Sequence, residues 1–142
     1  MLTEMTNNHR SHCPISLALE AIGDKWSLLI LRDLVLRGKT RYQELLASEE
    51  GISTNILANR LVRLEKRGLI AKSNDSGDKR RFRYSPTQKG LDLLPAIAEL
   101  ARWSAKYHPH TDQTNPYLKR LRTDAKGFKE ELRSRFTGPP ST

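Results

Sequence analysis

The segment from Gly51 to Ile70, GISTNILANRLVRLEKRGLI, constrains the fold more than any other stretch of the chain. Three of its leucines fall within about 60° of one another on a helical wheel: Leu57, Leu61 and Leu64. Ser53 is a favourable N-cap, and Gly68 can take the left-handed conformation that ends a helix. We therefore expect a helix that runs from Ser53 to about Arg67, with its leucines packed inward and its opposite face free.

The free face of this helix is built from polar and small side chains. Asn can make paired hydrogen bonds to adenine, Arg can donate two hydrogen bonds to guanine, and small residues allow close approach to the groove. Any surface helix needs a polar face, so the pattern alone leaves its purpose open. Its position after a short helix and a Gly-containing turn favours a DNA recognition helix. The candidate recognition residues are Ser53, Thr54, Asn55, Ala58, Asn59, Arg60 and Arg63.

Three helices are expected before this segment. The first begins at Pro14, a residue favoured at the first helical position, and ends at Gly23. The second, Lys25 to Leu36, is apolar nearly all round, as in a helix packed on several sides. Thr40 and Gln43 form a capping box that predicts the start of a short third helix.

The hydrophobic period changes after Gly68. LIAKS and KRRFRYS read as two strands around the turn NDSGD, where Gly77 can take a positive φ. Thr87 then caps a long helix that ends at Tyr107, and Pro95 within it predicts either a kink or a local start. The expected fold class is mainly α with a small β-ribbon.

The chain divides into four parts by composition. Leucines and other apolar residues recur at spacings of three and four between residues 115 and 136, which predicts one further amphipathic helix. The expected parts are a flexible N-terminal arm (1–12), the main domain (13–107), a linker with the C-terminal helix (108–136) and a disordered tail (137–142).

The charge of the chain points to a polyanionic partner. Its net charge is +9, and residues 37–83 alone carry twelve basic and six acidic residues, a net +6. A protein with a basic but inert surface could have the same net charge. Here, however, the excess of basic residues coincides with the predicted recognition helix and ribbon. On the predicted ribbon, or wing, the candidate DNA contacts are Lys79, Arg80, Arg81 and Arg83. The candidate contacts to the DNA backbone elsewhere are Lys39, Thr40, Arg41, Tyr42 and Lys66.

Several other classes of protein do not fit. No run of 18 apolar residues is present, so we expect no membrane association and a cytoplasmic protein. The four His lie in polar tails and Cys13 is the single cysteine, so we expect neither a disulfide framework nor a metal site. His12 is the only base near Cys13, and neither a Gly-rich phosphate loop nor paired catalytic carboxylates occur. We expect no enzymatic activity and no cofactor.

At this point the chain resembles the HxlR-type transcriptional regulators, which are winged helix-turn-helix proteins related to the MarR type. The matching pieces cover about residues 13–107: CPISLALEAIGDKWSLLILRDL, TRYQELL, GISTNILANRLVRLEKRGLI and YSPTQKGLDLLP. The resemblance implies a cytoplasmic homodimer that binds double-stranded operator DNA, with flanking dimerisation helices. Its implied dimer-interface residues, each of which could equally belong to the core, are Ile15, Leu19, Ile97, Leu100 and Trp103.

The chain departs from the family pattern in two places. Family wings often contain a Pro-Pro pair where this chain has SGDKRRF, which is closer to the Asp-x-Arg wing of MarR-type proteins. This resemblance implies that Asp78 orients Arg80. The chain also continues some 30 residues past the usual family end, and this segment could extend the dimer interface or contact DNA.

Cys13 directly precedes Pro14, where a helix dipole stabilises a thiolate. Relatives with a cysteine at this place include sensors of electrophiles or oxidants, and the alternative is a partly buried, inert residue. A small-molecule or oxidant effector is compatible with the sequence, which does not identify one. The leading hypothesis is a sequence-specific transcriptional regulator; the alternative is a non-specific architectural DNA-binding protein.

Overall fold

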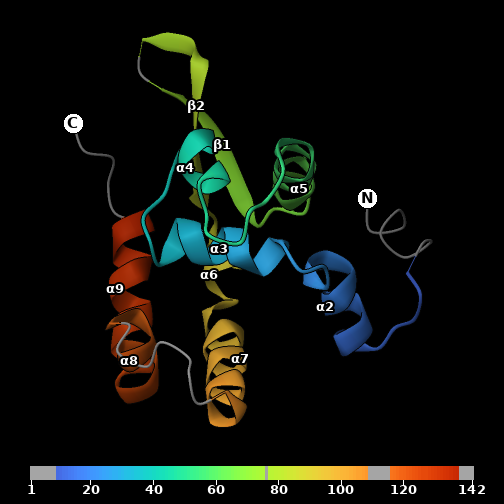
Figure 1. Cartoon of the computed structure of the whole chain (residues 1–142), viewed down its shortest axis with the longest axis vertical. Helices are drawn as coiled ribbons and strands as arrows, with labels where there is room; N and C mark the ends of the chain where they lie inside the picture. The colour runs from blue at the N-terminus through green and yellow to red at the C-terminus, as the bar shows by residue number, and fades with distance from the viewer. Residues whose placement is uncertain (1–8, 76, 109–115, 138–142) are drawn as a thin grey trace.

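The helix α3 (Ser27–Val35) crosses the middle of the molecule and forms the centre of its core (Figure 1). The computed structural model describes residues 9–75, 77–108 and 116–137. Ile30, Leu31 and Leu34 of α3 are at most 4% exposed, which confirms the prediction of a helix packed on several sides. The preceding helix α2 (Pro14–Ile22) stands away from this core and contains no buried residue.

Helices α4 (Tyr42–Leu46) and α5 (Thr54–Lys66) form the helix-turn-helix. Ser53 Oγ accepts the backbone N–H of Ile56 at 3.2 Å, which confirms the predicted N-cap. Gly68 has φ 75°, the left-handed conformation expected after the end of the helix. The predicted inward leucines are buried: Leu57, Leu61 and Leu64.

The predicted capping box at the start of α4 is wrong. The carboxylate of Glu44, rather than Gln43, reaches back to accept the backbone N–H groups of Thr40 at 3.2 Å and Arg41 at 3.0 Å. The carbonyl of Thr40 meanwhile accepts the N–H of Tyr84 at 2.8 Å. Because this link holds Thr40 in an extended segment beside the ribbon, the helix begins later, at Tyr42.

Strands β1 (Ile70–Asp75) and β2 (Asp78–Pro86) form the predicted ribbon, here called the wing. They pair antiparallel from Ile70 opposite Pro86, and Gly77 turns the chain with φ 84°. Ile70 and Tyr84 are buried at the base of the wing. The rest of the wing projects beyond the helices (Figure 1), so its base is fixed in the core and its tip is free.

The segment after the wing contains two helices. Thr87 Oγ1 accepts the N–H of Gly90 at 3.2 Å, as predicted for an N-cap, but its helix α6 (Gln88–Leu91) is short. A separate helix, α7 (Leu94–Tyr107), has Pro95 in its first turn. Of the two alternatives for this proline, the structure therefore has the local start.

The C-terminal segment also contains two helices where one was predicted. Helix α8 (Pro116–Thr123) ends before Asp124, whose Oδ1 accepts the N–H of Gly127 at 3.1 Å at the start of α9 (Ala125–Thr137). Asp124 thus caps α9 and divides the predicted single helix in two, although the spacing of apolar residues continues unchanged through it. Both helices pack on a second apolar cluster with α3, α6 and α7, whose buried members are Val35, Leu36, Leu91, Leu94, Ala98, Leu121, Phe128 and Leu132.

The expected N-terminal arm is held at its described end. His9 Nδ1 lies 2.6 Å from a carboxylate oxygen of Glu20, and the N–H of Arg10 donates to the other oxygen at 2.8 Å. The remainder of the predicted arm, most of the predicted linker and the tail beyond residue 137 lie outside the described residues.

Candidate nucleic-acid interface

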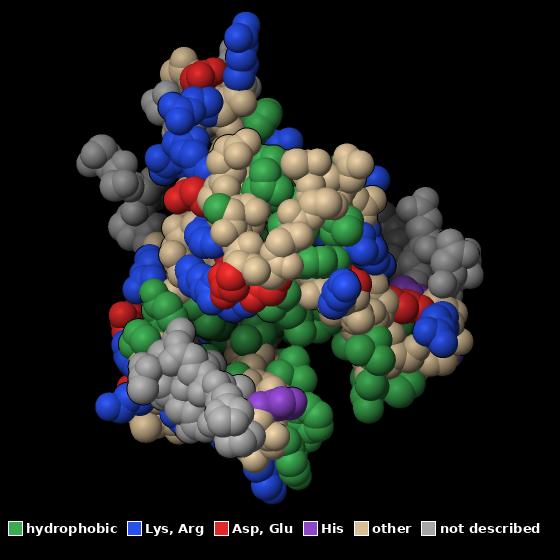
Figure 2. All heavy atoms as spheres, in the orientation of Figure 1, with side chains coloured by type: hydrophobic (Ala, Val, Ile, Leu, Met, Phe, Trp, Pro, Cys, Tyr) green, Lys and Arg blue, Asp and Glu red, His purple; other side chains and the backbone are tan. Residues whose placement is uncertain are grey.

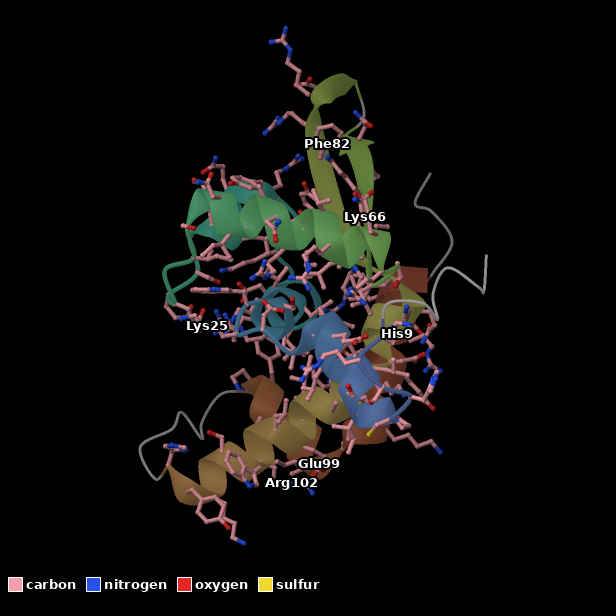
Figure 3. The ribbon with its side chains drawn as sticks, turned by 90° about the vertical axis from the view of Figure 1, so that its right-hand side faces the viewer. His9, Lys25, Lys66, Phe82, Glu99 and Arg102 are labelled. Atoms are coloured by element: carbon pink, nitrogen blue, oxygen red, sulfur yellow. The ribbon has the colours of Figure 1, made fainter. Side chains whose placement is uncertain are left out.

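The outward face of α5 is open along its length. In Figure 3 side chains stand off this helix beside the wing, and no other element covers them. Arg63 is half-buried, and the other predicted residues of this face are exposed: Ser53, Thr54, Asn55, Ala58 and Asn59, with Lys66 at the end near the wing. Val62 shares this surface and is 50% exposed, although it is not among the predicted contact residues.

Arg60 is placed differently from the other candidates on α5. Its Nε donates to Asp24 Oδ2 at 2.8 Å, and its Nη1 donates to Asn59 Oδ1 at 2.5 Å. Burial raises the pKa of Asp24, but hydrogen bonds from Ser27 and Arg60 outweigh it and lower this pKa to about 2. Arg60 therefore lies on the flank of α5 that faces the core, paired with an ionised carboxylate.

The residues that precede α4 are also partly engaged within the protein. Lys39 Nζ lies 3.7 Å from Asp33 Oδ2 and 3.4 Å from Ser48 Oγ. The hydroxyl of Tyr42 donates to the carbonyl of Thr54 at 3.1 Å, which joins the start of α4 to the start of α5. Lys39 is thus oriented by a buried carboxylate, whereas Tyr42 connects the two helices.

An open groove of about 420 Å³ lies between the start of α4 and strand β2. The groove brings together predicted backbone-contact residues and predicted wing residues that are 40 positions apart in the sequence. Its lining residues are Arg41, Tyr42, Gln43, Glu44, Arg80, Arg81, Phe82 and Tyr84. Three guanidinium groups at one groove favour the binding of a phosphodiester backbone. Glu44, Phe82 and Tyr84 had no signal in the sequence, because only the fold places them there.

The wing presents its cations to solvent. Arg80, Arg81 and Arg83 are exposed, and Figure 2 shows Lys and Arg side chains gathered over the wing. Asp78 Oδ1 accepts the backbone N–H of Arg80 at 2.9 Å, so the expected contact between Asp78 and Arg80 is made through the main chain of Arg80. The side chain of Lys79 lies outside the described residues.

A separate apolar surface lies away from α5 and the wing. Five large side chains of α2 and α7 are more than half exposed: Ile15, Leu19, Leu100, Trp103 and Tyr107. Ile97, also predicted at a dimer interface, is half-buried and packs against the main core. Figure 2 shows hydrophobic side chains at the free ends of α2 and α7, on either side of an open notch.

Cys13 occupies the N-cap of α2 and its thiol is exposed, which differs from the partly buried residue considered as an alternative. Hydrogen bonds from the backbone of Ser16 and Ile15 lower the pKa of this thiol. Within the described part of the chain, no group of three His, Cys, Asp or Glu residues could hold a metal ion. In that same part, none of the helices has the length and apolar character needed to cross a bilayer.

Comparison with known proteins places this arrangement in a family. The family model described as HxlR-like helix-turn-helix matches residues 21–112. A relative from Mycobacterium tuberculosis, named as the uncharacterized HTH-type transcriptional regulator MT3179, is 38% identical over 95 residues, which are 67% of this chain and 59% of that protein. The chain therefore spans less than two thirds of that relative's length.

Two solved structures show the same fold. The crystal structure of PA1607 has a TM-score of 0.66 and 33% identity, with 76% of this chain and 74% of that chain covered. The structure named as the redox regulator HypR in its oxidized form has a TM-score of 0.57 and 26% identity, with 66% of this chain and 96% of that chain covered. These likenesses confirm the predicted winged helix-turn-helix fold class.

Proposed function

The chain belongs to the HxlR-like helix-turn-helix family, and from this premise we propose that it is a sequence-specific DNA-binding transcriptional regulator. One observation carries the proposal: the uncovered face of α5 lies beside a wing with exposed arginines and an arginine-lined groove. A duplex needs this combination of a groove-reading helix and flanking cations. Such a regulator acts on chromosomal DNA, so the proposal includes a cytoplasmic location.

In this proposal α5 enters the major groove and reads base edges. Asn55 and Asn59 offer paired hydrogen bonds to adenine, and Arg63 can fork onto the two acceptors of guanine. Ala58 is small enough to let the helix approach thymine methyl groups. The exposure of Asn55, Ala58 and Asn59 in the protomer supports this assignment, whereas Arg63 is half-buried on the same helix.

The surroundings of α5 would bind the phosphate backbone. Arg41 from the start of α4, with Arg80 and Arg81 from the wing, lines the groove in which one backbone strand can lie. Lys66 and the wing residues Lys79 and Arg83 would contact the neighbouring phosphates or the minor groove. Thr40 lies at the edge of this surface and would contact a phosphate from there. Lys39 would strengthen phosphate binding through its positive charge.

A homodimer is the second part of the proposal. One recognition helix reads only a few base pairs, whereas two helices about 34–36 Å apart read a palindrome along one face of DNA. The exposed side chains of Leu19 and Trp103 support a second copy of the chain as the partner for α2 and α7, because monomers seldom leave such residues in water. Ile97 would contribute less than predicted, since it packs against its own core.

Dimerisation can be tested by placing a charge in the apolar surface. Leu19→Asp or Trp103→Asp should convert a dimer into a monomer in sedimentation experiments and weaken operator binding. Ser73→Asp on the exposed part of β1 places the same charge away from α2 and α7 and is a matched control that should leave the mass unchanged. A dimer that survives both charged variants would refute this interface.

The reading of DNA sequence is tested by Asn59→Ala and Arg63→Ala on an operator selected from random DNA. Each should weaken operator binding by about 1–3 kcal/mol, roughly 5- to 150-fold, and relax preference at one base position. Arg102→Ala removes one cation from α7, far from α5, and should leave binding unchanged. Operator binding that withstands both α5 variants would contradict the proposal.

Competition with bulk DNA at fixed salt separates this function from the alternative. A sequence-specific protein prefers its site by about 10³-fold or more. The architectural alternative would use the same cations and show no preferred site. We favour specific recognition because the exposed face of α5 presents Asn side chains that can pair with base edges.

We also propose that oxidation of Cys13 regulates DNA binding. The exposed thiol, its lowered pKa and the likeness to a protein named as a redox regulator support this role. An oxidant such as diamide would take two electrons and join Cys13 to a second thiol, from the partner protomer or from glutathione. Operator affinity of the wild type should respond to diamide, and Cys13→Ser should not. Equal responses would leave Cys13 as an inert residue.

A further inference from the structure

We propose that two acidic residues, Asp24 just before α3 and Asp33 within it, set the orientation of the recognition helix α5 and so act as positioning residues for DNA reading. The inference rests on the proposed function, because it assigns a purpose to charged groups behind the DNA-facing surface. It also gives Arg60 a role different from the base contact that the sequence predicted.

Asp24 connects the first turn of α3 to the middle of α5. Its Oδ2 accepts the backbone N–H groups of Trp26 at 3.0 Å and Ser27 at 3.1 Å, and its Oδ1 accepts the Ser27 hydroxyl at 2.5 Å. Ser27 is only 2% exposed, so the carboxylate is anchored to the core. Arg60 Nε then donates to the same Oδ2 at 2.8 Å, from 36 positions further along the chain.

Asp33 connects the last turns of α3 to the turn that precedes α5. It is 2% exposed, and a buried carboxylate requires partners for its charge. Arg32 Nε donates to Oδ1 at 3.0 Å, and Arg37 Nη1 lies 3.3 Å from the same atom. The hydroxyl of Ser48 donates to Oδ2. Ser48 begins the turn that leads to the N-cap of α5, so this contact fixes where the helix starts.

The other side of that turn is held by two forked ion pairs. Arg32 donates to both oxygens of Glu50 at 2.7 and 2.8 Å, and Arg37 donates to both oxygens of Glu49 at 2.8 and 2.7 Å. Both arginines also contact Asp33. Ser48, Glu49 and Glu50 of the turn are therefore each tied to a side chain in or just after α3.

These contacts supply something that the apolar core of α5 does not. Burial of leucines decides which face of a helix turns inward, but it is non-directional and tolerates small rotations and slides. Charge-assisted hydrogen bonds fix both distance and angle. Because base recognition requires side chains to be placed within a fraction of an ångström, a helix fixed at its start and at its middle is suited to it.

Residual dipolar couplings of the DNA-free protein test the inference directly, since they report the orientation of α5 relative to α3. Arg60→Gln and Asp24→Asn should each change the couplings of α5 amides relative to those of α3. Asn keeps a side-chain oxygen that can cap α3, so Asp24→Asn removes mainly the charge. Arg63→Gln is the matched control: it removes an equal charge from the same helix, on its outward side, and should leave the orientation unchanged.

Operator binding supplies the second measurement. Arg60→Gln and Asp24→Asn should each weaken operator affinity about 5- to 10-fold. Neither should change the affinity for bulk DNA or the salt dependence of binding. The double variant should lose no more operator affinity than the weaker-binding single variant, because both substitutions break the same contact. If Arg60 bound a phosphate instead, its loss would reduce the slope of log K against log salt by about 0.9, and Asp24→Asn would not weaken binding. That result, or an unchanged orientation of α5, would overturn the inference.

Ser48→Ala keeps the inference testable should Asp24→Asn reduce the folded population. The variant removes the hydroxyl contact to Asp33 and no charge, so a loss of operator affinity with an unchanged salt slope would support positioning. An unchanged affinity would count against it. If the wild type shows no preferred DNA site, the proposed function fails, whereas the dipolar couplings still report whether the two acids orient α5.

Discussion

The docking of α9 on the winged-helix body can be measured with a single substitution, Leu132→Ala. Leu132 is 0% exposed and lies in the apolar cluster that α9 shares with α3, α6, α7 and α8. Replacing a fully buried leucine by alanine costs about 2–5 kcal/mol, and the cost is smaller where neighbours can close the cavity. Because α9 is a terminal helix that can shift toward the body, we expect about 3 kcal/mol.

This free energy converts into a measurable change in Tm. Unfolding entropy of about 2.1 cal/mol/K per residue gives roughly 0.3 kcal/mol/K for 142 residues, so 3 kcal/mol corresponds to a decrease of about 10 °C. The assay is thermal unfolding followed by circular dichroism at one fixed protomer concentration, because the Tm of a dimer depends on concentration.

Ser134→Ala on the exposed side of α9 is the control and should change stability by no more than about 0.5 kcal/mol. A shift of less than about 2 °C for Leu132→Ala would refute the reasoning. It would show that α9 does not unfold with the winged-helix body.

Three further predictions concern the frame that holds α5. Ser53→Ala removes the N-cap of α5 and should cost about 1 kcal/mol in urea unfolding, whereas Thr54→Ala, one residue later, should cost less. Gly68→Ala places a side chain at φ 75° and should cost about 1–2 kcal/mol; a neutral result would mean that the turn can relax. The carboxyl of Asp24 has a folded pKa of about 2, below its unfolded value near 3.9, so its stabilisation is present above about pH 4 and is lost as the pH falls toward 2. After allowance for screening at this partly exposed site, the wild type should exceed Asp24→Asn in stability by about 1 kcal/mol at pH 6, and a difference that persists at pH 2 would contradict this assignment.

Local chemistry explains why so much of the fold could be predicted from the sequence. The start of α5 depends on Ser53, whose hydroxyl accepts an N–H only three residues later, and its end depends on the backbone conformation of Gly68 itself. The wing likewise follows from alternation and from Gly77. Periodicity and capping act over one or two turns, so a single sequence contains them.

Two predictions were wrong for different reasons. At the start of α4 the sequence offers both Gln43 and Glu44 as partners for the free N–H groups, and the choice depends on the pairing of Thr40 with Tyr84. In the C-terminal segment the apolar pattern continues through Asp124, so it could not reveal that this residue ends one helix and caps the next.

The sequence by itself determined that this chain has an amphipathic helix after a short turn, a basic ribbon and an apolar central helix, because each depends on neighbouring residues. Only the tertiary structure decided which partners the charged side chains have. Arg60 and Arg63 are three positions apart on one helix, and helical spacing puts Arg60 nearer the leucines than Arg63. Spacing does not reveal that Arg60 is bound, since the carboxylate belongs to Asp24, 36 residues earlier, and only the fold brings it within hydrogen-bonding distance.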